Sequence, residues 1–407
     1  MDSMMKTSQP GSSHAWLVLG GLAGLATLQP MLGCGTTSLD TGTTATEVAV
    51  VFDLLADVGP QVILPTLDRF LIALDTVDQT LEALDLEAGQ DNDARAAAQS
   101  AFVDALLIWQ ELEVMQIGPA ASSLSAIAGE NLRDEIYSWP TVNACRVDQV
   151  TSAEEWEDKG FFEATQVNAY GLDALDYLLH AAPESECPTA VTPISDGLWD
   201  TMGELGVAAN RANLALSLAG RIRAEAERLR EKWAVDGENF SGQLAMNDSS
   251  PYSTTQEALN AVFDGLFYLE TMTKDTKLAA PIAQANKGEL AEADEIEGLW
   301  SETGLEAIAH NLIGFELLFT GGEGIGFDDL LVELGHADLS DQILVDLETA
   351  VTAAGAVEAP LAQAVTDYPE QVQALHAAVK NVTDVLKGDL ATVLSLQIPS
   401  EAAGDND

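Results

Sequence analysis

Apolar residues recur at intervals of three and four positions along most of this 407-residue chain, whereas the strict alternation typical of strands is scarce. The first pattern is that of helices with one apolar face. We therefore predict an all-α protein with helices at 47–58, 61–85, 93–116, 160–181, 193–235, 254–275, 300–319, 338–355 and 369–395. Prolines, which lack an N–H, fall between these segments or at their ends: Pro60, Pro119, Pro183, Pro188, Pro251, Pro281 and Pro369.

A stretch rich in Gly, Asn, Asp and Ser, AVDGENFSGQLAMNDSSPYS at 234–253, interrupts the helical pattern near the middle of the chain. Segments before and after it resemble each other weakly, which favours a duplicated up-and-down bundle. We predict two packed helical bundles at 47–235 and 254–398, a linker loop at 236–253 and an acidic tail at 399–407.

The N-terminus has the pattern of an export signal. The apolar run AWLVLGGLAGLATL at 15–28 follows Lys6 and is too short to span a bilayer as a helix, so we expect a signal peptide over 1–33. MLGC at 31–34 resembles a bacterial lipobox and predicts a lipid on Cys34, so that residues 34–46 would form a lipidated N-terminus and a Thr/Gly tether. This indicates a lipoprotein of the bacterial cell envelope, anchored in the outer or inner membrane and facing the periplasm or the cell surface. Secretion with cleavage nearby is the alternative.

The net charge of the chain limits the classes of partner that it can bind. The chain has 66 acidic and 17 basic residues, a formal net charge of −49. This balance excludes nucleic-acid binding, which needs Lys and Arg, and favours the attraction of cations. With 47% apolar residues, the chain can nevertheless build a globular core.

Two cysteines remain beyond the N-terminus, Cys145 and Cys187. In an exported protein a pair of cysteines favours a disulfide, because the compartment is oxidising. Such a bond would close a loop of about 40 residues. Two buried free thiols are the alternative.

The segment NAYGLDALDYLLHA at 168–181 carries the candidate chemistry. On a helix, Asp173, Asp176 and His180 share one narrow strip, and the rest of the surface is apolar or aromatic. Buried carboxylates are costly unless they are paired, hydrogen-bonded or bound to a metal. The three side chains would therefore converge on one cation, and two aspartates suit a hard cation or a mixed oxygen–nitrogen iron site better than zinc. Alternatively, the two acids lie on a solvent-facing edge of the helix.

A second segment, WQELEVMQ at 109–116, is the natural partner of this strip. Trp109, Glu113 and Gln116 are spaced to share one helix face, so Glu113 would add a third carboxylate. Tyr137 and Trp139, in YSWP, would form a wall of the pocket. The alternatives are ordinary core packing for the aromatic residues and a solvated Glu113.

Several ordered motifs resemble the imelysin family: WQELEVMQIGP (109–119), IYSWPTVNACRVDQ (136–149), GLDALDYLL (171–179), KLAAPI (277–282) and NLIGFELLFTGGEGIGFDDLL (311–331). The resemblance covers about residues 48–395. It implies two facing helical bundles and a link to the uptake of iron or another metal. The founding member of the family also implies peptidase activity.

The signature motif of the family, Gly-x-His-x-x-Glu, corresponds here to Gly171, Asp173 and Asp176. Because Asp replaces the His, zinc binding and peptidase activity are put in doubt. We expect a lipoprotein that binds a divalent or ferric metal ion, with iron favoured over zinc, or a metal-linked ligand. It would act in uptake or sensing without catalysis, alongside other envelope metal-uptake proteins. The alternatives are a metallopeptidase that uses a metal-bound water and a surface interaction protein with a decayed site.

The site that we predict has two parts. The metal ligands would be Asp173, Asp176, His180 and Glu113, and the pocket around them would be lined by Trp109, Gln116, Tyr137, Trp139 and Gly171.

Overall fold

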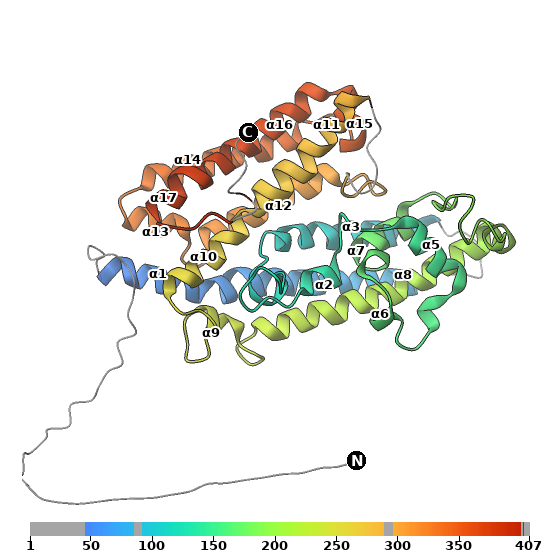
Figure 1. The fold of residues 1–407 in the computed structure, drawn as a ribbon, viewed down its shortest axis with the longest axis horizontal. Coiled ribbons are helices and arrows are strands. Elements are labelled where there is room, and N and C mark those ends of the chain that lie inside the picture. Colours follow the sequence, from blue (N-terminus) through green and yellow to red (C-terminus); the bar gives the residue numbers. More distant parts are fainter. Residues whose placement is uncertain (1–44, 85–91, 289–295, 400–401, 403–407) are drawn as a thin grey trace, which may run out of the picture. The chain divides into compact units, whose positions relative to one another are not determined.

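All regular structure in the described residues, 45–84, 92–288, 296–399 and 402 of the computed structural model, is helical (Figure 1). The predicted all-α class is therefore confirmed. The predicted signal peptide, the lipidated Cys34 and most of the tether and acidic tail lie outside the described residues.

The chain begins with one long helical run that contains a proline. The run consists of α1 (Ala45–Asp57), a π-helical turn (Val58–Ile63) and α2 (Leu64–Glu82). Pro60 lies inside the π turn, so the predicted break at this residue is wrong. A π turn departs from the α-helical hydrogen-bonding register, which accommodates the missing N–H of proline.

A second π segment (Leu269–Ala279) precedes Pro281 in the same way. It follows α10 (Thr255–Leu266) and leads into α11 (Ala280–Lys287), so the helical run again continues beyond its predicted end.

By length and composition, the run from Thr46 to Glu82 would be able to cross a membrane. Its large apolar residues Leu55, Leu67, Phe70 and Leu74 are nevertheless fully buried in the protein. In this structure the run is therefore a core helix.

Helix α3 (Asn92–Glu113) packs against α2 and against α12 (Gly304–Thr320), and so joins early and late parts of the chain (Figure 1). The contact with α12 needs a glycine, because a Cβ on Gly314 would lie 2.3 Å from the main-chain oxygen of Glu111. The predicted division of the chain into two bundles stays a prediction.

Helix α8 (Leu198–Trp233) packs on α2, and two of its arginines pair with acids of that helix. Arg223 contacts Asp75 and Asp78, and Arg230 contacts Asp68. Exposed ion pairs of this kind add little stability, so apolar packing holds the two helices together.

Helix α7 (Leu172–His180) is shorter than predicted. Instead of one helix from 160, the chain forms α6 (Phe161–Ala164) and a 3₁₀ turn (Val167–Ala169) before α7 starts. Gly171 has φ +98°, and a Cβ there would lie 3.1 Å from the main-chain oxygen of Ile136. The helix therefore cannot extend backwards through this residue.

Other helices complete the fold. Several short ones were not predicted: α4 (Leu132–Ile136), α5 (Ala144–Ala153), α9 (Phe240–Leu244), α13 (Phe327–Glu333) and α15 (Leu361–Asp367). The remaining elements are α14 (Ala337–Gly355), α16 (Pro369–Val385), a π turn (Leu386–Leu390) and α17 (Ala391–Val393).

A disulfide joins Cys145 to Cys187. Beside it, the buried carboxylate of Asp148 accepts hydrogen bonds from the Ser185 hydroxyl and the Glu186 N–H, each at 2.8 Å. It also accepts one from the hydroxyl of Tyr177 in α7, at 2.8 Å. The segment after α7 is therefore fixed to α5 by one covalent bond and several polar contacts.

We expect Gly314→Ala to lower the free energy of unfolding by about 1–3 kcal/mol, because its Cβ would force α12 away from α3. Gly220→Ala is the matched control in α8, since a Cβ there meets nothing within 4 Å. It should raise stability by up to ~1 kcal/mol through helix propensity. Thermal unfolding of both variants measures the difference. Equal stability of the two variants would show that the close approach of α12 to α3 is not required.

Candidate functional site

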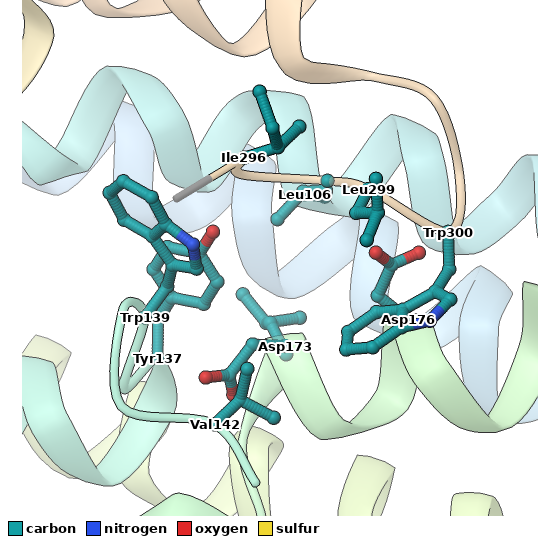
Figure 2. Close-up of a pocket in the computed structure, with 11 residues that line it drawn as sticks. Leu106, Tyr137, Trp139, Val142, Asp173, Asp176, Ile296, Leu299 and Trp300 are labelled. Atoms are coloured by element: carbon teal, nitrogen blue, oxygen red, sulfur yellow. The ribbon is translucent and has the colours of Figure 1, made fainter. Parts of the chain in front are cut away.

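A small cavity lies beside α7, with room for about one water molecule (Figure 2). Its polar walls are the carboxylates of Asp173 and Asp176. The other walls come from the start of α7, from α3, from the segment after α4 and from the segment before α12: Leu172, Leu106, Tyr137, Trp139, Val142, Ile296, Gly298, Leu299 and Trp300.

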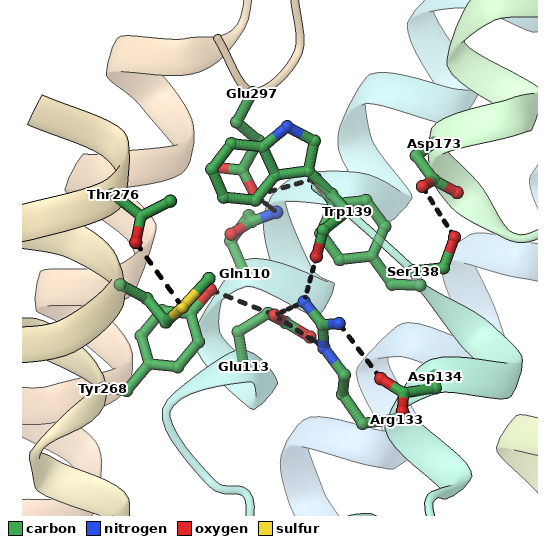
Figure 3. Close-up of polar contacts among 12 residues, drawn as sticks. Gln110, Glu113, Arg133, Asp134, Ser138, Trp139, Asp173, Tyr268, Thr276 and Glu297 are labelled. Atoms are coloured by element: carbon green, nitrogen blue, oxygen red, sulfur yellow. Dashed lines mark hydrogen bonds and ion pairs between the residues drawn. The ribbon is translucent and has the colours of Figure 1, made fainter. Parts of the chain in front are cut away.

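Asp173 is 4% exposed. One carboxylate oxygen lies 2.9 Å from the hydroxyl of Ser138 and the other accepts the N–H of Ala174 at 3.0 Å (Figure 3). Burial raises the pKa of Asp173 to about 7, although these two hydrogen bonds and the charge of Arg133 oppose the shift. When protonated, Asp173 would donate to Ser138, whose own hydroxyl is 2.9 Å from the oxygen of Val167.

Asp176 is equally buried but has a different environment. Nδ1 of His180 lies 3.0 Å from its Oδ1 and 3.2 Å from its main-chain oxygen. The hydrogen-bond geometry favours the main-chain oxygen, and no described residue donates a hydrogen bond to Oδ1. A buried carboxylate oxygen without a donor is costly, so this atom fits a bound cation or a water.

The predicted metal ligands are only partly brought together. The structure pairs Asp176 with His180 and places Asp173 at the same cavity. Within the described ranges, no group of three or more His, Cys, Asp and Glu side chains is placed to hold a metal ion.

Glu113 is buried and is bound by other partners than the predicted ones (Figure 3). Both of its oxygens accept hydrogen bonds from Arg133, the shortest at 2.8 Å. The hydroxyl of Tyr268 donates to it at 3.0 Å. Glu113 therefore neutralises an arginine in this structure.

Arg133 connects this pair to the site. Its guanidinium also donates to the main-chain oxygen of Trp139 at 2.9 Å. Arg133, Trp139 and Tyr268, together with Gln116, line a wider crevice at the surface. Trp139 therefore lines both the crevice and the cavity.

A buried ion pair lies between the cavity and α12. Lys277 is 1% exposed and its Nζ is 2.6 Å from Oε2 of Glu297, which is also 1% exposed. The ammonium group donates to Gln110 at 2.9 Å and to Asn311 at 2.7 Å as well. Burial lowers the pKa of Lys277, while the charge of Glu297 opposes the shift.

The other carboxylate oxygen of Glu297, Oε1, has two further hydrogen-bond donors. It accepts the hydroxyl of Tyr137 at 2.7 Å and the amide of Gln110 at 3.0 Å (Figure 3). We call the set of Lys277, Glu297, Gln110, Tyr137 and Asn311 the lysine network.

The predicted pocket residues separate into different places. Tyr137 and Trp139 line the cavity, and Gln116 lines the crevice. Trp109 is core and packs on Phe70, with ring centroids 5.2 Å apart.

Gly171 is the residue before α7 and shapes the start of that helix. The prediction that Trp109, Glu113 and Gln116 share a helix face is wrong, because α3 ends at Glu113.

Five residues that organise the site were not predicted as site residues: Gln110, Arg133, Lys277, Glu297 and Asn311. Basic residues are rare in this chain, so a lysine within the apolar stretch KLAAPI could have marked Lys277 as a candidate site residue. Glu297 was not distinguishable by sequence among 66 acids.

The chain matches one family model and is similar in fold to solved structures. The family model described as Imelysin, Peptidase M75, matches residues 63–387. No curated protein matches the chain.

Two solved structures are similar in fold. One is from Parabacteroides distasonis and is described as an iron-regulated protein A precursor; it has 17% identity and a TM-score of 0.66, over 88% of this chain and 98% of that one. The other is an imelysin-like protein from Psychrobacter arcticum with 15% identity and a TM-score of 0.66, over 86% of this chain and 97% of that one. At these identities the likeness shows the fold alone.

The raised pKa of Asp173 predicts a pH dependence of stability in the metal-free protein. Between pH 3.8, the ordinary pKa of an aspartate, and about pH 7, Asp173 keeps a proton in the folded state that it has lost in the unfolded state. This contribution to stability is present at low pH and disappears as the pH rises through about 7. Asp173→Asn should therefore gain stability relative to wild type, by about 1–4 kcal/mol, between pH 4 and pH 8.

Unfolding midpoints of chelator-treated protein across this pH range measure the effect. Asp200→Asn, at an exposed position of α8, is the control and should follow the wild-type curve. Parallel curves for wild type and Asp173→Asn would contradict the assignment.

Proposed function

This chain belongs to the imelysin family, and from that premise we propose that it binds a metal ion or a metal-linked ligand at Asp173 and Asp176. It would act in metal uptake or sensing in the bacterial cell envelope, without catalysis.

The observation that supports the proposal best is the environment of Asp176. Its Oδ1 is buried beside the imidazole of His180 and accepts no hydrogen bond from the described residues. A second carboxyl, that of Asp173, lines the same small cavity. A cation in the cavity would satisfy this oxygen and offset the cost of burying the carboxylate.

The donor set favours iron over zinc. The two carboxylates that line the cavity, with the imidazole of His180 beside Asp176, would form a mixed oxygen–nitrogen set if an ion drew them together, and the motif position that would hold a histidine is Asp173. The iron-regulated description of the similar protein from Parabacteroides distasonis supports the same choice.

The envelope location rests on the sequence. The predicted signal peptide and lipid on Cys34 would anchor the protein to the outer or inner membrane, facing the periplasm or the cell surface. Its partners would be the membrane itself and other envelope proteins of metal uptake. The net charge of −49 speaks against nucleic acid as a partner.

Binding is better supported than peptide hydrolysis. A metallopeptidase needs a metal that is held by several protein ligands and keeps an open position for water. At the motif positions of this chain, Asp173 and Asp176 offer carboxylates only, without the His or Cys ligands that zinc prefers.

The test is the metal content of the exported protein, measured by mass spectrometry after loading with ferrous, ferric, manganese or zinc salts. We expect wild type to retain iron and Asp173→Asn/Asp176→Asn to lose it, because the double variant lacks both carboxylates. Asp200→Asn, at an exposed position, should keep the wild-type content.

Equal metal content in wild type and the double variant would contradict the proposal. If the equal content is near zero, the result would also agree with a decayed site in a surface interaction protein. Chelator-sensitive cleavage of peptides by wild type alone would support the metallopeptidase alternative.

A further inference from the structure

We propose that residues 296–300 form a strap that closes the cavity of Asp173 and Asp176, and that the ion pair between Lys277 and Glu297 is its latch. The inference rests on the proposed function where it concerns the metal. The closure itself is measurable without metal.

The strap forms one wall of the cavity. Four of its five residues line the cavity, namely Ile296, Gly298, Leu299 and Trp300. Figure 2 shows Leu299 and Trp300 next to the carboxylate of Asp176. Movement of the strap would therefore expose both carboxylates to solvent.

The backbone of the strap is weakly attached. Counting only described residues, its one main-chain hydrogen bond joins the oxygen of Gly298 to the N–H of Thr303 at 3.1 Å, within the same turn. Gly298 has φ +60°, which favours glycine, and the turn leads directly into α12. A segment with so few backbone hydrogen bonds to neighbouring elements opens at low cost.

Side chains hold the strap in place instead. Glu297 points away from the cavity into the lysine network, where Lys277, Tyr137 and Gln110 each bind its carboxylate. These three partners come from three different parts of the fold. The strap cannot lift while Glu297 stays in the network.

Opening the latch separates the two charges. When Glu297 leaves, its carboxylate becomes hydrated, and among the described residues Lys277 keeps only the neutral oxygens of Gln110 and Asn311 as acceptors. Because the buried ammonium group then lacks a counter-ion, opening is costly and the closed state is favoured.

Trp300 makes the second attachment. Its ring meets the ring of Tyr177 edge to face, with centroids 4.9 Å apart. Tyr177 is rigid, because its hydroxyl is bound to Asp148 at 2.8 Å beside the disulfide. Removing the Trp300 ring would loosen the strap while leaving every charge in place.

Hydrogen–deuterium exchange of the metal-free protein tests the strap. We expect Glu297→Gln and Trp300→Ala to speed exchange in peptides that cover 296–303 and α7 by about tenfold or more, because both loosen the cavity wall. The matched control is Glu302→Gln, an exposed acid of the same loop, which should exchange like wild type. Circular dichroism checks that each variant is folded. Unchanged exchange in folded Glu297→Gln and Trp300→Ala would overturn the inference.

The rate of iron release tests the latch in the loaded protein. With a strong chelator in excess, Glu297→Gln and Trp300→Ala should release iron about tenfold faster than wild type and Glu302→Gln. Equal release rates, in variants whose exchange shows a loosened strap, would overturn the inference while the proposed function stands. Faster exchange in a protein that binds no metal would support the strap and contradict the proposed function.

Discussion

The pairing of buried charges is the constraint on which this structure depends. The chain has few bases, and several of them are placed inside the fold opposite a carboxylate. Lys277 with Glu297 is the clearest case, since both are almost fully buried and their partners come from α3, α12 and the segment after α4. Either charge alone would be costly in that position. The pair therefore fixes how distant segments meet around the cavity.

The same constraint gives the two aspartates of α7 different properties. Asp173 has hydrogen-bonding partners on both oxygens and a pKa raised to about 7 by burial. Asp176 lies beside an imidazole and has one oxygen that receives no hydrogen bond from described residues. The protein thus supplies a partner to each oxygen of Asp173, whereas one oxygen of Asp176 is left without a donor among the described residues.

Periodicity was enough to predict the helical class and to single out Asp173, Asp176 and His180, because acids on an otherwise apolar helix stand out. It failed where the backbone leaves the regular helix. The end of α3 at Glu113 separated Gln116 from its predicted face, and Gly171 shortened α7. The contribution of residues 296–300 was not predictable either, because it depends on how distant segments pack and not on any local pattern.

In the signature motif at the start of α7, Gly171 is required by the backbone, whereas the two acidic positions carry the candidate chemistry. Its backbone conformation, with φ +98° and the Ile136 oxygen beside it, leaves no place for a side chain. The two acidic positions that follow carry no such restriction, because a helix accepts many residues at either of them. A relative can therefore exchange the side chains presented by this helix and keep its architecture. The motif then records a shared scaffold, while the chemistry at these two positions is free to diverge.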